Sequence, residues 1–207
     1  MKPQLIAILL LTVAACGQTQ NKTQNSLSSA TIDTTHKQTK SMSDYSPILD
    51  KAHPNAKRLM NEDFYWSPIE ETAPFGSDDG ADTYAGFADW RQSHKTANPK
   101  EFLMEQIDYW GYPTFDLNET NFEKLKPYLK QSDLGTRFMS GIDAAIAAIA
   151  FGQLYLEGTV DKDFKELAKT SIKRQLNSEM LNLWGDPYKV TRQTQLNKML
   201  AVLNQVE

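Results

Sequence analysis

The chain has 207 residues, a formal net charge of −4 and a sequence pI near 5.5. This length fits one domain of ordinary size together with its tails. An acidic chain lacks the basic patch or stripe that is typical of nucleic-acid-binding proteins, so no nucleic-acid partner is expected. The single cysteine excludes an intrachain disulfide and zinc sites built from several cysteines, and no metal or other cofactor is expected.

The N-terminus has the features of a secretory signal peptide. Lys2 precedes an apolar run over residues 5–15, which is too short to span a membrane as a helix. The run ends in the sequence VAAC at residues 13–16, which resembles the lipobox of bacterial lipoproteins. This resemblance implies that residues 1–15 are removed and that Cys16 carries acyl chains. An ordinary cleavable signal peptide with an incidental cysteine is the alternative.

The lipobox resemblance also predicts where the protein resides. Several acyl chains on Cys16 would anchor the protein stably in a lipid bilayer. Gly17 follows the cysteine, whereas an aspartate at that position resembles a signal for retention in the inner membrane. We therefore expect a cell-envelope lipoprotein in the outer membrane, facing the periplasm.

The composition divides the mature chain at about residue 44. Residues 17–43 contain no aromatic residue and are rich in Gln, Asn, Ser and Thr, so they cannot bury enough apolar surface to fold. We predict that residues 16–44 form the lipidated cysteine and a disordered linker. All of the aromatic residues lie in 45–207, which we predict to be a single helical domain.

The periodicity within residues 45–207 predicts an all-α fold: a compact multi-helix domain with a buried central helix and a long structured loop. Pro54 and the pair Asn98-Pro99 mark helix starts, and Gly111 marks a helix end. Residues 64–80 contain two prolines and two glycines and predict the loop. A helix is expected to follow over residues 79–94.

Residues 134–156 are apolar on nearly all sides and predict the central helix. A helix is also expected over 118–130, with Pro127 in an irregular or kinked stretch. Another is expected from Asp161 to Trp184, and the pair Asp186-Pro187 is expected to start the last helix, with Val190 on its inward face.

Three blocks of sequence resemble an uncharacterised bacterial family, the YfeS-like proteins. They are FYWSP at residues 64–68, APFGSDDG at 73–80 and DWR at 89–91. The resemblance covers most of residues 50–180 and implies no established activity, so no catalytic residue is carried over from it.

The most distinctive chemistry lies in residues 62–89, which hold eight acidic residues and no Lys or Arg. Acidic and aromatic residues together could bind a basic protein partner, because charge steers the encounter and aromatic anchors supply binding energy. The candidate interaction surface consists of Phe64, Tyr65, Trp66, Glu70, Glu71, Phe75, Asp78, Asp79, Asp82, Asp89 and Trp90. In the alternative interpretation, Asp78 and Asp79 cap the following helix and the aromatic residues belong to the core.

These observations favour a membrane-tethered periplasmic helical lipoprotein that acts as a protein-binding module without catalysis. An envelope assembly factor and an immunity-type protein that neutralises a toxin both fit this description. The alternative is a cell-wall-active hydrolase that uses a pair of carboxylates. Glu70 and Glu71 are adjacent, but neighbours on a loop do not define such a pair.

Overall fold

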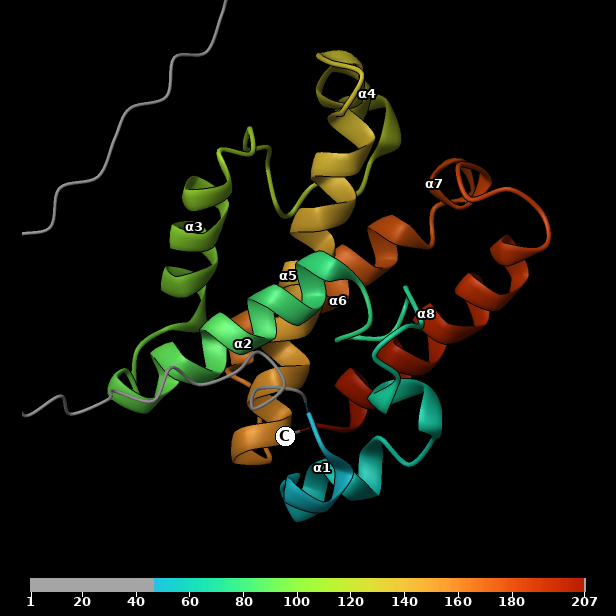
Figure 1. The fold of residues 1–207 in the computed structure, drawn as a ribbon. Coiled ribbons are helices and arrows are strands. Elements are labelled where there is room, and N and C mark those ends of the chain that lie inside the picture. The colour runs from blue at the N-terminus through green and yellow to red at the C-terminus, as the bar shows by residue number, and fades with distance from the viewer. Residues whose placement is uncertain (1–46, 207) are drawn as a thin grey trace, which may run out of the picture. The chain divides into compact units, whose positions relative to one another are not determined.

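The computed structural model describes residues 47–206 (Figure 1). The predicted signal peptide, the lipidated Cys16 and the predicted linker over 16–44 lie outside the described residues. The described part is built of α-helices and short 3-10 helices without a strand, which confirms the all-α prediction. The helices are α1 (Pro54–Leu59), α2 (Asp78–Ser93), α3 (Pro99–Trp110), α4 (Phe122–Lys130), α5 (Gly135–Glu157), α6 (Lys162–Gln175), α7 (Ser178–Asn182) and α8 (Tyr188–Gln205).

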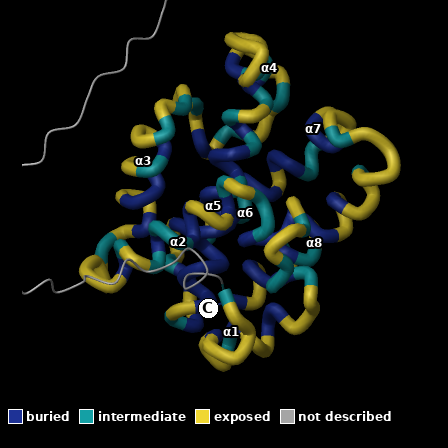
Figure 2. The backbone as a smooth tube through the Cα atoms, in the orientation of Figure 1, coloured by how far each residue is buried: buried dark blue, intermediate teal, exposed yellow. Residues whose placement is uncertain are grey.

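Helix α5 is the centre of the domain. It packs against α1, α2, α3, α4 and α6, and its residues 145–155 are all buried (Figures 1 and 2). Among the described residues, α5 alone is long and apolar enough to cross a membrane, but 83% of the apolar window is buried inside the domain. A helix that is apolar on all sides and covered by other helices is the core of a folded domain, as the sequence predicted.

Local sequence sets most of the helix ends. The His53 side chain caps α1 ahead of Pro54, and the Asn98 side chain caps α3 ahead of Pro99. Helix α3 ends at Gly111, whose φ of 66° lies in the left-handed region that glycine adopts without strain. These caps and prolines confirm the boundaries predicted for α1 and α3.

Three boundaries differ from the sequence-based predictions. Helix α4 starts at Phe122 rather than at 118, because the Asn121 side chain caps it. Pro127 lies inside this helix at an exposed position, so water can bond the backbone carbonyl for which proline has no N–H donor. The helix that starts after Asp161 ends at Gln175, because the Asn177 side chain caps a separate helix, α7. Helix α8 starts at Tyr188 without a side-chain cap.

The inward face of α8 also starts later than predicted. Val190 is 68% exposed, because the first turn of α8 extends beyond the core. The buried positions on this helix are Arg192, Gln195, Leu196, Met199, Val202 and Leu203. The first buried side chain of α8 is therefore an arginine.

Candidate functional site

The structure divides the predicted acidic and aromatic surface into a buried part and an exposed part. Tyr65 and Phe75 are only 2% and 3% exposed and belong to the main core, so they are not available to a partner. Phe64 and Trp66 are partly buried and pack against the same core. Trp90 is also partly buried and stacks on His94, with 4.5 Å between the ring centroids. The prediction of a common aromatic surface was therefore wrong for Tyr65 and Phe75, because their rings fill the space between helices.

The acidic residues at the start of α2 do not act as its N-cap. That role belongs to Ser77, whose hydroxyl accepts a hydrogen bond from the Gly80 N–H at 3.1 Å. Asp78 and Asp79 lie in the first turn, where a negative charge interacts favourably with the helix dipole. Asp79 also forms an ion pair with Arg137 of α5.

The remaining acidic residues of the predicted surface lie at different places. Glu71 lines the same pocket as Asp78 and Asp79, and Glu70 lines the hollow beside it. Asp82 and Asp89 are exposed on α2 and line neither. Only part of the predicted set is therefore brought together.

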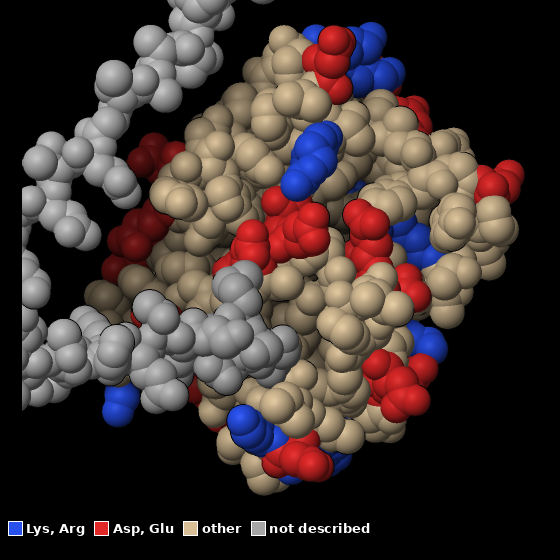
Figure 3. All heavy atoms as spheres, viewed as in Figure 1, with Lys and Arg blue, Asp and Glu red and all other residues tan. Residues whose placement is uncertain are grey.

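The pocket is formed where α2 begins, beside α5 and α8, and has a volume of about 460 Å³. Figure 3 shows acidic side chains gathered near the centre of the visible face, over the N-terminal end of α2. The pocket is lined by Glu71, Ser77, Asp78, Asp79, Asp133, Thr136, Arg137, Ser140, Ala144, Leu183, Trp184 and Arg192. Four carboxylates from three chain segments thus surround it, against two arginines.

Two further hollows share residues with this pocket. A cavity of about 40 Å³ lies deeper and shares Glu71, Ser140 and Arg192 with it. A hollow of about 520 Å³ lies beside it, shares Glu71, Trp184 and Arg192, and is also lined by the exposed side chains of Ile69 and Tyr188. Arg192 and Glu71 line all three hollows, which we call together the Arg192 pocket. Its mouth is the pocket of about 460 Å³, and its floor is the cavity of about 40 Å³.

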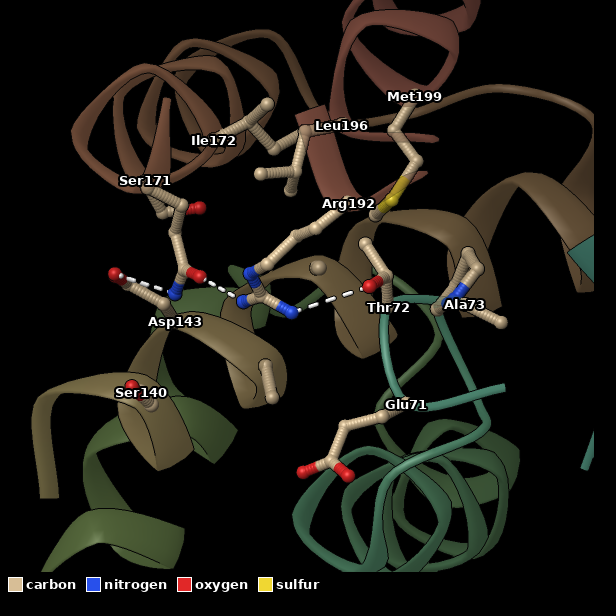
Figure 4. Close-up of a pocket in the computed structure, with 14 residues that line it drawn as sticks. Glu71, Thr72, Ala73, Ser140, Asp143, Ser171, Ile172, Arg192, Leu196 and Met199 are labelled. Atoms are coloured by element: carbon tan, nitrogen blue, oxygen red, sulfur yellow. Dashed lines mark hydrogen bonds between the residues drawn. The ribbon is translucent and has the colours of Figure 1, made fainter. Parts of the chain in front are cut away.

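A buried polar network connects Arg192 to the core. Its guanidinium donates hydrogen bonds to the Thr72 hydroxyl at 3.2 Å and to the side-chain oxygen of Gln175 (Figure 4). The Gln175 amide donates to Asp143 of α5 at 2.9 Å. Asp143 in turn pairs with Arg174 of α6, and both side chains are at most 1% exposed.

Within this network, Arg174 and Asp143 neutralise each other's charge and are joined by hydrogen bonds. Two of the Arg174 nitrogens bond the Asp143 carboxylate, and the third donates to the backbone oxygens of Leu117 and Glu119 at 3.0 and 2.8 Å. One positive and one negative charge cancel there, so Asp143 has its ion pair with Arg174 and forms none with Arg192.

Arg192 is a buried cation without an ionic partner. It is 7% exposed, and no carboxylate of the described residues lies within 4.0 Å of its nitrogens. Its Nε is buried without a hydrogen-bond partner, and its guanidinium lies 3.7 Å from the centre of the Trp184 ring. Burial lowers the pKa of Arg192 to about 10, although the charges of Glu71 and Asp143 act in the opposite direction. It therefore remains positively charged at neutral pH.

The described residues contain no group of three or more His, Cys, Asp or Glu side chains arranged to hold a metal ion. The charged side chains that line the Arg192 pocket favour charge recognition. Its mouth is negative, and its floor presents a single desolvated guanidinium.

Sequence reasoning missed Arg192, Asp143 and Trp184 as residues of the site, although one signal each could have revealed Arg192 and Asp143. Arg192 stands at helical spacing from Leu196, Met199 and Leu203, the inward face of α8. Asp143 is the single charged residue between 138 and 156, in the most apolar helix. A charged residue on an inward face is a candidate functional group.

The fold and the pocket define a class: a helical domain with a partly buried, charged pocket. The chain is distantly similar to the "Uncharacterized protein YfeS" of Escherichia coli (strain K12), with 26% identity over 137 residues. The match covers 65% of this chain and 54% of the relative, so the chain spans about half of the relative's length. No family model and no solved structure matches the chain. The similarity agrees with the resemblance seen in the sequence and adds no activity.

Proposed function

We propose that the protein is a lipoprotein of the cell envelope, anchored through Cys16 in the outer membrane and facing the periplasm, and that it binds a basic segment of a partner protein without catalysis. An envelope assembly factor and an immunity-type protein are two roles of this kind. The binding site in this proposal is the Arg192 pocket.

The observation that carries the proposal is the ring of carboxylates around this pocket. Glu71, Asp78 and Asp133 come from three separate segments, and none of them forms an ion pair with a described residue. Unpaired carboxylates at the mouth of a pocket attract a cationic group and raise its rate of association. The exposed side chains of Leu183, Ile69 and Tyr188 border the same area and offer apolar contact, as the centres of protein interfaces do.

The proposal is tested by replacing the three carboxylates together, as Glu71→Gln, Asp78→Asn and Asp133→Asn. A partner isolated from detergent-solubilised envelope by the wild-type protein should bind this variant more weakly. Its association rate should also lose most of its dependence on salt.

The matched control is a second triple variant, Asp82→Asn, Glu105→Gln and Asp108→Asn, with the same change in net charge at exposed positions outside the pocket. This control should bind as the wild type does. If both triple variants reduce binding equally, general charge rather than the pocket governs the interaction, and the proposed site is wrong.

A further inference from the structure

The Arg192 guanidinium has hydrogen-bonding capacity that the protein leaves unused. A guanidinium carries five N–H donors. Two of those on Arg192 are used, on Thr72 and Gln175, and Nε has no partner. A buried charge without an ion pair is destabilising, and the Trp184 ring with the more distant charges of Glu71 and Asp143 offsets only part of this cost, because the pKa of Arg192 stays lowered. An arginine here therefore needs a reason beyond packing.

The cavity under the pocket mouth has room for a small anionic group beside Arg192. Two carboxylates also line it: Asp143, whose charge Arg174 neutralises, and Glu71, which belongs to the mouth as well. The cavity volume of about 40 Å³ admits a few water-sized groups, which is room for the two oxygens of a carboxylate but not for a bulky side chain. Arg192 reaches into it from α8, as Figure 4 shows, and the Ser140 hydroxyl lines it from α5. Planar guanidinium groups bind carboxylates with two parallel hydrogen bonds.

The mouth of the pocket adds a second requirement. A ligand that carried only negative charge would have to pass Glu71, Asp78 and Asp133 and would be repelled by them. A ligand that carried only positive charge would leave Arg192 unpaired. Both parts of the pocket are satisfied by a ligand that has a carboxylate at its end and a cationic group next to it.

We propose that the Arg192 pocket binds the C-terminus of a polypeptide whose last residue is Lys or Arg. The terminal carboxylate enters the small cavity and pairs with Arg192, and the basic side chain lies among the carboxylates at the mouth. This inference rests on the proposed function and specifies which part of the partner is bound. Free basic amino acids share the same chemistry, so the test includes one.

The test uses the full-length protein in detergent and three synthetic tripeptides, followed by isothermal titration calorimetry. The peptides are Ala-Ala-Lys with a free C-terminus, the same peptide with an amidated C-terminus, and Ala-Ala-Leu with a free C-terminus. The amide should bind about tenfold to a hundredfold more weakly than the free acid, because it lacks the charged acceptor for Arg192. Ala-Ala-Leu should also bind more weakly than Ala-Ala-Lys, with a smaller dependence on salt. Free lysine is the fourth ligand, and binding equal to that of the tripeptide would overturn the polypeptide source in favour of a free amino acid.

Two variants test which part of the pocket binds each end of the ligand. Arg192→Met should remove the difference between acid and amide, and Asp78→Asn with Asp133→Asn should remove the preference for Lys over Leu. A thermal unfolding curve shows whether each variant is folded. If Arg192→Met does not fold, the comparison of acid with amide on the wild-type protein decides the question alone.

The outcomes separate this inference from the proposed function. Equal binding of acid and amide, both weakened by the loss of the mouth carboxylates, would overturn the carboxylate subsite and leave the basic-segment proposal standing. The carboxylate subsite is likewise overturned if no peptide binds at millimolar concentration while the isolated partner still binds in a pocket-dependent way. If the pocket variants bind the isolated partner as strongly as the wild type does, both the carboxylate subsite and the basic-segment proposal are overturned.

Discussion

The buried pair of Asp143 and Arg174 gives the sharpest prediction about what holds the domain together. Asp143→Ala removes the acceptor of the hydrogen bonds from Arg174 and of the bond from the Gln175 amide. Arg174 is 0% exposed, so its charge can neither reach water nor find another carboxylate without rearrangement of α5 and α6.

The expected loss follows from this burial. Breaking a buried ion pair by removing one partner costs about 3–5 kcal/mol, because the other charge stays desolvated. Asp143 also opposes the effect of burial on Arg192, so its removal leaves two uncompensated cations on neighbouring helices. We therefore expect a loss near the upper end of that range, which is a large part of the roughly 5–15 kcal/mol that stabilises a typical domain.

The assay is urea unfolding followed by tryptophan fluorescence, and the control is Glu62→Ala. Glu62 pairs with Lys198, but these side chains are 45% and 39% exposed. An exposed pair is worth about 0–1 kcal/mol, so this variant should unfold close to the wild type. If Asp143→Ala also stays within about 1 kcal/mol of the wild type, the Asp143 site is accessible to water and the reasoning about the buried network is wrong.

Three further predictions test other parts of the molecule. Gly158→Ala should destabilise the domain more than Gly111→Ala. Both glycines have positive φ, but a Cβ at 158 would overlap the ring of His53, which caps α1. Displacing this cap adds about 0.5–2 kcal/mol to the loss of stability measured by urea unfolding. Burial raises the pKa of Tyr128 to about 12, so the folded state keeps its proton longer than the unfolded state, and this tyrosine alone should lower the stability by about 2 kcal/mol or less between pH 10 and 12. Tyr128→Phe should make this fall shallower in unfolding curves measured across that range. Cys16→Ser should release the protein into the soluble periplasmic fraction, and detergent-dependent membrane fractionation of this variant would contradict the lipid anchor.

The sequence was sufficient where structure is decided locally. The central helix could be predicted because an uninterrupted apolar run needs cover on all sides, whatever the covering helices are. The starts at Pro54 and Pro99 could be predicted because a cap residue and a following proline act within one turn. Asn177 was missed because a helix break inside an amphipathic stretch resembles an ordinary polar position of a longer helix.

The candidate site could not be predicted to the same extent, because it depends on contacts between distant segments. Thr72 and Arg192 are 120 residues apart, and Asp143 and Gln175 are 32 apart. The inward helical spacing of Arg192 was its one local signal, and that spacing does not show which distant segments surround the side chain. Conversely, the aromatic residues near the acidic cluster suggested a surface, although packing draws Tyr65 and Phe75 into the core. Local composition identified the region of the pocket mouth but not its floor.

The position of Arg192 is difficult to explain by the needs of the fold. Apart from the buried Gln195, the neighbouring positions on the inward face of α8 are apolar, with Leu196, Met199 and Leu203 at most 4% exposed. Well-packed apolar side chains often stabilise such sites as well as buried ions do. The ion pair of Asp143 with Arg174 already joins α5 to α6 without net charge. Arg192 adds an unbalanced cation and leaves Nε without a partner, yet it lines every hollow of the pocket. A charge that the folded domain does not neutralise, held at the base of a pocket that opens to solvent, is most simply explained by an anionic group that arrives with the ligand.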